Sequence, residues 1–138
     1  MKLFIDTNVL LDVILERDDY ENAARIMSLP DTSHGIKLYA SILSMANIAY
    51  ITRRNLQGNS FYQMMNNLSL LISVLPMNKN TLRSAISLRA KDFEDALQYI
   101  CAKETNCDIL ITRNKKDFNF SEIPVLTPLE FLQKQGVL

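Results

Sequence analysis

Short apolar runs alternate along this chain with longer segments whose apolar residues recur at helical spacing. The apolar runs predict five short strands near residues 2–5, 36–40, 71–75, 108–112 and 124–126. The intervals predict seven helices near residues 8–16, 19–28, 43–55, 59–69, 80–89, 93–105 and 128–134. Because strands that alternate with helices pair in parallel through right-handed crossovers, we expect an α/β fold around a mostly parallel sheet of about five strands.

Several predicted helices have recognisable ends. Pro30 predicts that the second helix stops before it, because proline cannot continue a helix. Asn78 or Asn80 can cap the helix that follows the third strand. Pro128 stands behind Thr127, which is the arrangement expected for the first turn of the last helix.

Composition indicates one globular domain, residues 1–138. The chain is 48% hydrophobic and 22% charged, which is ordinary for a folded soluble protein and unlike a disordered one. Residues 68–77 form the richest apolar stretch, which is far too short to span a membrane. The apolar run before Asp6 has only three residues, from Leu3 to Ile5, which is too short for a signal peptide, so we expect a cytoplasmic protein with no membrane contact.

Charge and ligand types restrict the possible chemistry. Fifteen Lys and Arg balance fifteen Asp and Glu, so a nucleic-acid site must depend on a local patch or on metal ions. Two cysteines and one histidine supply neither a Cys and His zinc site nor a disulfide framework. Any metal would therefore be held by oxygen ligands, which points to magnesium or manganese.

Acidic residues occur where an α/β sheet normally binds its ligands. Asp6 follows the first predicted strand, Asp92 and Asp95 begin the sixth helix, and Asp117 follows the fourth strand. Ligands of open α/β sheets lie beyond the carboxyl ends of the strands. Carboxylates gathered there repel one another unless a cation neutralises them, so the pattern favours a divalent metal. Phosphodiester hydrolysis is the reaction that fits such a site.

Three segments together resemble the PIN-domain family. They are Ile-Asp-Thr-Asn-Val-Leu at residues 5–10, Asp-Phe-Glu-Asp-Ala-Leu-Gln at residues 92–98, and the segment from Ile109 to Phe118. The resemblance implies a three-layer α/β/α sandwich that carries a magnesium- or manganese-dependent ribonuclease site. It also implies a homodimer that acts on RNA and, as a VapC-type toxin, pairs with an antitoxin protein.

The resemblance also assigns roles to residues. Asp6 and Asp95 would bind the metal, and Asp117 would join them as a catalytic acid. Supporting or substrate-binding roles would fall to Thr7, Asn8, Asn47, Asp92, Thr112, Arg113 and Asn114. Asn47 stands where the family commonly has Glu, and Asn114 where it often has a fourth acid. Since an amide adds no charge, this site would hold its ion less tightly, and Asp117 or Asp92 can compensate.

Several of these residues also have structural readings. The segment at Asp6 can simply turn the chain and cap the first helix, and Asp92 can be a helix cap. Asp117 can be a solvated loop acid, and Asn47 can be a buried polar residue that needs a partner. For Asp12 we expect a solvated position. Three basic pairs can bind RNA phosphates, although basic residues on helices are usually solvated: Arg53 with Arg54, Lys79 with Arg83, and Arg89 with Lys91.

The function that these observations favour is a metal-dependent endoribonuclease that hydrolyses RNA phosphodiester bonds. The alternative is an inactive PIN-like domain that binds RNA or a protein, which Asn47 and Asn114 make plausible. A haloacid-type phosphatase also begins with a strand and an Asp, but it needs a second acid where this chain has Asn8. A phosphoaspartate receiver lacks a convincing companion lysine here.

Overall fold

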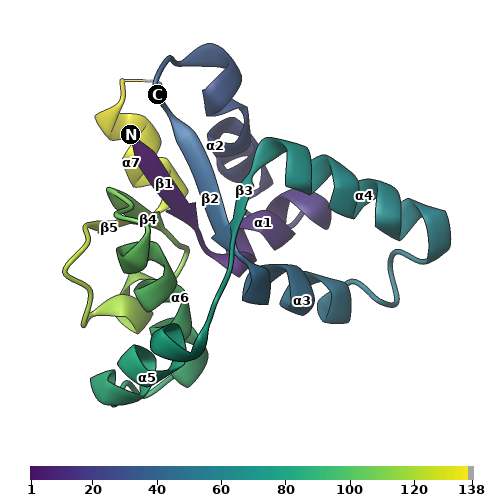
Figure 1. The fold of residues 1–138 in the computed structure, drawn as a ribbon. Helices are drawn as coiled ribbons and strands as arrows, with labels where there is room; N and C mark the ends of the chain where they lie inside the picture. Colours follow the sequence, from purple (N-terminus) through teal and green to yellow (C-terminus); the bar gives the residue numbers. More distant parts are fainter. Residues whose placement is uncertain (137–138) are drawn as a thin grey trace.

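The computed structural model describes residues 1–136, and these contain one five-stranded sheet (Figure 1). The strands are β1 (Lys2–Ile5), β2 (Lys37–Ser41), β3 (Ser73–Leu75), β4 (Ile109–Ile111) and β5 (Val125–Leu126). They run parallel in the order β3-β2-β1-β4-β5. The predicted α/β fold is confirmed. Residues 137 and 138 of the predicted domain lie outside the described residues.

Seven α-helices fill the intervals in the described part of the chain, as predicted. They are α1 (Thr7–Ile14), α2 (Tyr20–Thr32), α3 (Ile42–Ile51), α4 (Gly58–Leu71), α5 (Lys79–Leu88), α6 (Phe93–Glu104) and α7 (Pro128–Lys134). A 3₁₀-helix, η1 (Lys115–Phe118), was not predicted, because its lysine-rich sequence carries no apolar periodicity. None of the helices within residues 1–136 is long and apolar enough to cross a membrane.

The central strand β1 explains why helices cover both faces of the sheet. Its side chains alternate, so that Leu3 and Ile5 enter one hydrophobic cluster and Phe4 enters the other, all three without solvent exposure. The first cluster contains buried residues of α1, α2, α3 and α7. The second contains residues of α5, α6 and η1. The three-layer α/β/α sandwich is thereby confirmed, with α5 and α6 opposite α1 and α2 (Figure 1).

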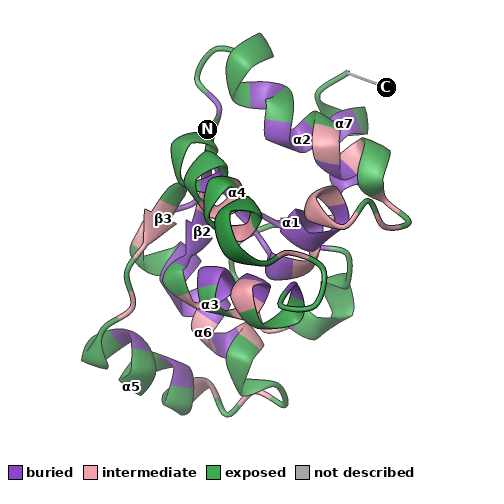
Figure 2. Cartoon of the chain, turned by 90° about the vertical axis from the view of Figure 1, so that its right-hand side faces the viewer, coloured by how far each residue is buried: buried purple, intermediate pink, exposed green. Residues whose placement is uncertain are grey.

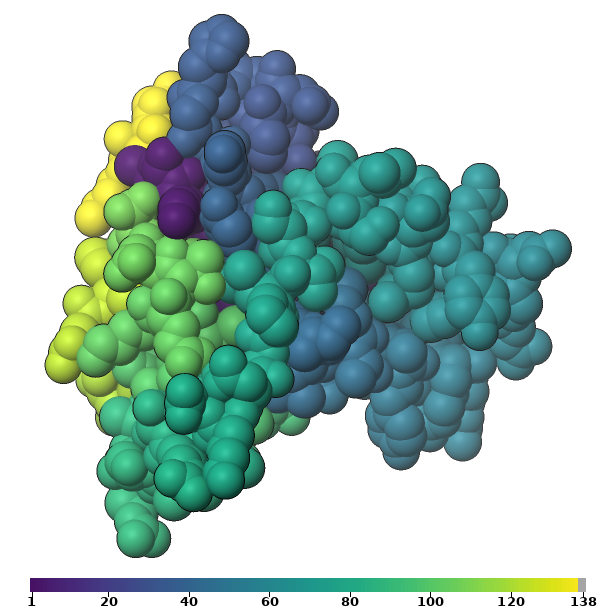
Figure 3. Space-filling view, viewed as in Figure 1, coloured from purple at the N-terminus to yellow at the C-terminus, as the bar shows by residue number. Residues whose placement is uncertain are grey.

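Helix α4 is much less embedded than the others. Leu68 is its one buried residue, whereas Tyr62 and Leu70 are 70% and 78% exposed. Figure 2 shows the outer side of α4 exposed along its length. In the space-filling view α4 projects from the body of the molecule together with the end of α3 (Figure 3). This arm therefore presents large apolar side chains to solvent.

The prediction that the second helix ends before Pro30 is wrong, because α2 continues to Thr32. Proline removes one helical hydrogen-bond donor, but the turn around it is held in other ways. Leu29 is buried in the core, and its carbonyl accepts from the Ser33 N–H at 2.8 Å. Burial of Leu29 thus carries the helix past the proline.

Helix α3 ends at Ile51, four residues before the predicted end. The hydroxyl of Thr52 donates to the Ile48 carbonyl at 2.7 Å, and the Thr52 N–H donates to the same carbonyl at 2.9 Å. These bonds satisfy the last turn of α3 without further helix. The chain then passes through a turn before α4 begins.

The predicted caps at Asn78 and Thr127 are confirmed. Each forms a capping box, in which the cap side chain and the third helical residue exchange hydrogen bonds with backbone N–H groups. In α7 the Thr127 hydroxyl accepts from the Glu130 N–H at 3.2 Å, and the Glu130 carboxylate accepts from the Thr127 N–H at 2.9 Å. This start places Phe131 and Leu132 in the core.

Replacing Thr127 by Ala should destabilise the protein by about 1 kcal/mol, because the Glu130 N–H at the start of α7 loses the hydroxyl that accepts its hydrogen bond. Urea unfolding monitored by circular dichroism measures the change. The Thr127→Ser variant retains the hydroxyl and should stay close to the wild type. Equal losses in both variants would show that the methyl group, and not the cap, matters.

Candidate active site

The order of the strands creates a crevice between β1 and β4. The chain proceeds from β1 to β2 and β3 on one side of the sheet, and then returns to place β4 on the other side of β1. At such a switch point the connections leave in opposite directions and open a crevice at the carboxyl ends. Asp6 directly follows β1, and Thr112 directly follows β4. Two of the predicted site residues therefore meet at this point.

Asp6 caps α1, which confirms its structural reading, and it also lies at the carboxyl end of β1 beside this crevice. Its carboxylate is 7% exposed and accepts hydrogen bonds from the Thr7 N–H and the Thr112 hydroxyl, each at 2.9 Å. Burial raises the pKa of Asp6 to about 6, and the negative charges of Glu94 and Asp117 add to this, while the two hydrogen bonds oppose it. Asp6 is thus a buried acid that gains from a nearby cation.

A cleft of about 360 Å³ opens above Asp6. Its lining comes from the starts of α1 and α6 and from α3: Asp6, Thr7, Asn8, Asn47, Tyr50, Ile51, Glu94 and Asp95. Three of these side chains are carboxylates, and none is basic. The cleft is therefore an acidic site of the kind predicted from the sequence.

Asp95 is the second predicted metal ligand, and it lies in this cleft. Burial raises the pKa of Asp95 to about 7, and the carboxylates of Asp92, Asp6, Asp117 and Glu94 raise it in that order of effect. Burial and all four neighbouring carboxylates therefore disfavour the charged form of Asp95. A cation between Asp95 and Asp6 would remove that penalty.

Glu94 is the cleft residue that sequence reasoning missed. Its carboxylate accepts from the Asn47 amide at 2.6 Å, which also gives the half-buried Asn47 the partner it needs. A carboxylate on α6 therefore lies beside the amide at position 47. A Glu beside Asp95 in the first turn of α6 was the available signal, but the sequence does not show which way its side chain turns.

The two residues expected to compensate for Asn47 and Asn114 lie elsewhere. Asp92 is exposed and caps α6 by accepting from the Asp95 N–H at 3.2 Å, which confirms its structural reading. Asp117 is exposed in η1 and does not line the cleft, although its charge raises the pKa of both cleft aspartates. Asn114 is also exposed, and its backbone N–H donates to the Thr112 hydroxyl at 3.2 Å.

A buried polar network supports the start of α1 from below. The Gln98 amide donates to the hydroxyls of Thr7 at 3.2 Å and Ser44 at 2.9 Å, and its oxygen accepts from Ser41 at 2.6 Å. Thr7 and Ser44 also share a hydrogen bond of 2.8 Å. The network joins α1, α3 and α6, and it was not predicted. Gln98 follows Asp95 by three residues, so both lie on the same side of α6.

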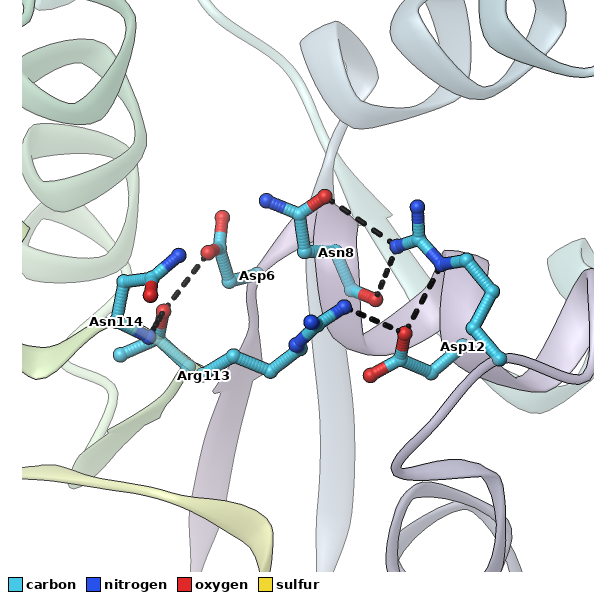
Figure 4. A network of polar contacts seen from close by, with 7 residues as sticks. Asp6, Asn8, Asp12, Arg113 and Asn114 are labelled. Atoms are coloured by element: carbon cyan, nitrogen blue, oxygen red, sulfur yellow. Dashed lines mark hydrogen bonds and ion pairs between the residues drawn. The ribbon is translucent and has the colours of Figure 1, made fainter.

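The prediction that Asp12 is solvated is wrong, because its side chain has no solvent exposure. One carboxylate oxygen accepts from Arg113 at 2.7 Å and from Arg17 at 3.0 Å (Figure 4). The other oxygen has no hydrogen-bond partner among residues 1–136. Two arginines from opposite sides thus close over a carboxylate on the inner face of α1.

A supporting or substrate-binding role was expected for Arg113, and the structure directs its side chain along α1. Figure 4 shows its side chain reaching to Asp12 rather than to Asp6. Arg17 donates to the Asn8 carbonyl at 3.2 Å and to the Asn8 side chain at 3.4 Å. Arg17 therefore holds the first turn of α1 at Asn8, and both arginines hold Asp12.

A three-layer α/β/α fold with an acidic cleft at the β1–β4 switch point defines the class of this protein. The chain belongs to the PIN-domain family, since the family model for the PIN domain matches residues 2–116. It is similar to Ribonuclease VapC1 of Aquifex aeolicus (strain VF5), with 28% identity over 99% of this chain and 97% of the relative.

Solved structures share the fold at lower identity. A toxin-antitoxin complex from Klebsiella pneumoniae matches with a TM-score of 0.70 and 22% identity, covering 91% of this chain and 97% of that one. VapC20 of Mycobacterium tuberculosis, described as a sarcin-ricin loop cleaving toxin, matches with a TM-score of 0.66 and 14% identity, covering 88% and 98%. These likenesses establish the architecture.

Replacing Asp12 by Asn should destabilise the protein by roughly 1.5 to 3 kcal/mol, because Arg17 and Arg113 lose a charged acceptor. Both arginine side chains are 34% exposed and can return to water, which keeps the loss below that of a fully buried ion pair. Urea unfolding measures it, with the exposed Asp18→Asn as the control. A loss no larger than that of the control would contradict the role of this ion pair.

Replacing Asp6 by Asn should alter how stability depends on pH. Because the pKa of Asp6 is raised in the folded state, its protonation favours folding at low pH, and this contribution is lost between about pH 4 and pH 6. The neutral amide of the variant does not titrate and loses nothing there. At about 1.4 kcal/mol per pKa unit, the variant should gain up to about 3 kcal/mol relative to the wild type by pH 7.

Urea unfolding from pH 4 to pH 7 in the presence of a chelator provides this test. Asp31→Asn, which removes an exposed carboxylate on α2, is the matched control and should follow the wild type. A constant difference between Asp6→Asn and the wild type across this range would show that the pKa of Asp6 is not raised in the folded protein.

Proposed function

We propose that this protein is a divalent-metal-dependent endoribonuclease that hydrolyses phosphodiester bonds in RNA. The observation that carries the proposal is the acidic cleft, in which Asp6, Glu94 and Asp95 meet without a basic residue in the lining. Such a site attracts a divalent cation and, with it, a phosphodiester. The name of the relative Ribonuclease VapC1 supports the same activity.

The donor set of the cleft fits magnesium or manganese held largely through water. No group of three or more His, Cys, Asp or Glu side chains within residues 1–136 is arranged to enclose a metal. Magnesium is commonly bound by only one or two carboxylates while it keeps several waters. Asp6 and Asp95 would hold the ion, and the raised pKa of each carboxyl favours such neutralisation. When bound, the cation supplies positive charge for the phosphodiester and makes a nearby water more acidic.

The side chains around the cleft have separate tasks in this proposal. Thr112 and the Thr7 N–H fix the Asp6 carboxylate, so that it does not reorganise during the reaction. Asn47 orients the Glu94 carboxylate through one oxygen, which leaves the other free to accept a proton from the attacking water. The water oxygen then bonds to phosphorus, the ester bond on the opposite side breaks, and the departing ribose oxygen takes a proton from solvent.

We further propose that the protein pairs with an antitoxin and forms a homodimer. The structural neighbours include toxin-antitoxin complexes, which supports the first partner. The exposed apolar side chains of the α3–α4 arm, among them Tyr50, Tyr62 and Leu70, provide a surface for a protein contact. The cytoplasmic location remains a prediction.

A second candidate function is an inactive PIN-like module that binds RNA or protein. The amides at Asn47 and Asn114 favour it, because neither side chain adds negative charge to the site. Such a module would retain the fold and the cleft but would not cut RNA. Metal binding separates the two functions, because only the nuclease requires the cation.

Cleavage of a mixed pool of transfer and ribosomal RNA by the purified protein should require magnesium or manganese and stop with a chelator. Asp6→Asn and Asp95→Asn should each lower the rate by at least about 100-fold, since each removes charge from the reaction site. Gel electrophoresis of the RNA gives the rates. Asp31→Asn is the charge-matched control on α2 and should cut like the wild type.

Three outcomes of these experiments would contradict or narrow the proposed nuclease activity. If the folded wild type cuts no RNA and calorimetry detects no manganese binding, the inactive module becomes the better interpretation. If Asp6→Asn cuts as fast as the wild type, the acidic cleft is not the site of the reaction. Manganese binding without cleavage would retain the metal site and reject the mixed RNA pool as substrate.

A further inference from the structure

A second hollow lies beside the acidic cleft, and its three basic residues outnumber its two carboxylates, Asp92 and Asp117. This basic groove, of about 620 Å³, runs between the turn from α5 to α6 and the segment from Lys116 to Phe120. Three of its lining residues are basic: Arg89, Lys91 and Lys116. The volume falls within the ~300–1,000 Å³ range of ligand pockets in proteins. It is therefore large enough to receive part of a ligand.

The groove and the cleft adjoin each other at the first turn of α6. Asp92, which caps this helix, lines the groove, whereas Glu94 and Asp95, two and three residues later, line the cleft. Asp117 also lines the groove, and its charge acts on both Asp6 and Asp95. A chain that leaves the cleft along this side of α6 enters the basic groove.

The basic side chains of the groove are available to bind an anion. Arg89, Lys91 and Lys116 are exposed, and none of them lies within 4.0 Å of a carboxylate of residues 1–136. Lys115, the neighbour of Lys116, is by contrast paired with Glu130 at 3.0 Å. Arg89 also holds a left-handed backbone conformation, with φ of 52°, at a helix end where glycine is usual. Three cations thus stand unpaired beside an acidic site.

One wall of the groove is aromatic. Phe120 is half-buried and meets the ring of Tyr99 edge to face, with the ring centroids 5.3 Å apart. Tyr99 is itself 1% exposed, so this contact fixes the position of Phe120. Grooves for single-stranded nucleic acid combine basic side chains that follow the backbone with aromatic rings that contact bases. The basic groove contains both elements.

We propose that the basic groove binds the single-stranded RNA next to the bond that is cut. Lys91 and Lys116 each hold a phosphate of the flanking nucleotides, and Phe120 contacts one of their bases. This path rests on the nuclease function proposed above. It explains how an acidic cleft retains a polyanion, because the cations next to the cleft offset its repulsion. Single strands are favoured over duplexes, since a paired base is not free to reach Phe120.

Binding of a fluorescent oligouridine of about 12 nucleotides tests the groove without cleavage when a chelator is present. The variant Lys91→Gln/Lys116→Gln removes two groove cations. Lys37→Gln/Lys134→Gln is the matched control, because it removes two exposed lysines that do not line the groove. Urea unfolding should show equal stability for both double variants, since all four side chains are exposed.

The expected result is a change in the salt dependence of binding. Loss of two phosphate contacts should reduce the slope of log K against log salt by about 1.4. If the affinities converge at about 1 M salt, the groove variant binds about 25-fold more weakly than the wild type at about 0.1 M. The control should show a slope and an affinity close to those of the wild type.

Cleavage of the same oligonucleotide with magnesium separates failure of the groove from failure of the nuclease. If the wild type cuts RNA but the groove variant matches the control in slope and affinity, the groove proposal is overturned and the nuclease stands. If the slope changes as expected but the oligonucleotide is not cut, the groove is supported as an RNA site and oligouridine is rejected as a substrate of the nuclease. If both double variants lose affinity equally, binding is diffuse and the groove proposal is overturned.

Discussion

The structure depends on one buried carboxylate at the junction of β1 and α1. Asp6 joins a strand to a helix and is tied across the sheet to the end of β4 through Thr112. Its backbone N–H also donates to the Ile111 carbonyl at 2.9 Å, so main chain and side chain both connect the two strands. This tie fixes the crevice at the switch point, but it places an acid where burial raises its pKa. The charged form of Asp6 is therefore unfavourable in the folded protein unless a cation lies nearby.

Two acidic sites near α1 differ in whether basic side chains neutralise them. Asp12 is fully buried, and two arginines neutralise it directly. In the cleft, Asp6 and Asp95 have no basic partner, and their neighbours are further carboxylates. The contrast indicates that arginines within reach of α1 serve the structural acid and leave the cleft uncompensated. An arginine in the cleft would neutralise these carboxylates and disfavour a cation there.

The electrostatic field around the cleft also depends on where the basic residues lie. The chain has no net charge, yet three of its basic residues line the groove beside the cleft and none lines the cleft itself. An acidic centre bordered by a basic groove can hold a cation and a polyanion together, since each charge faces its complement. A uniformly basic protein would bind RNA without placing a particular phosphate at the acids.

The sequence alone determined the elements and their order, because hydrophobic period, turn residues and helix caps act over a few residues. It also placed Asp6 and Asp95 at the same edge of the sheet, since both stand at the ends of elements that a parallel sheet aligns. Only the tertiary structure decided which side chains meet. Asn47 finds Glu94 across 47 positions, and Asp12 finds Arg113 across 101. Such pairs depend on how helices rotate and pack against the sheet, and no local pattern specifies that rotation.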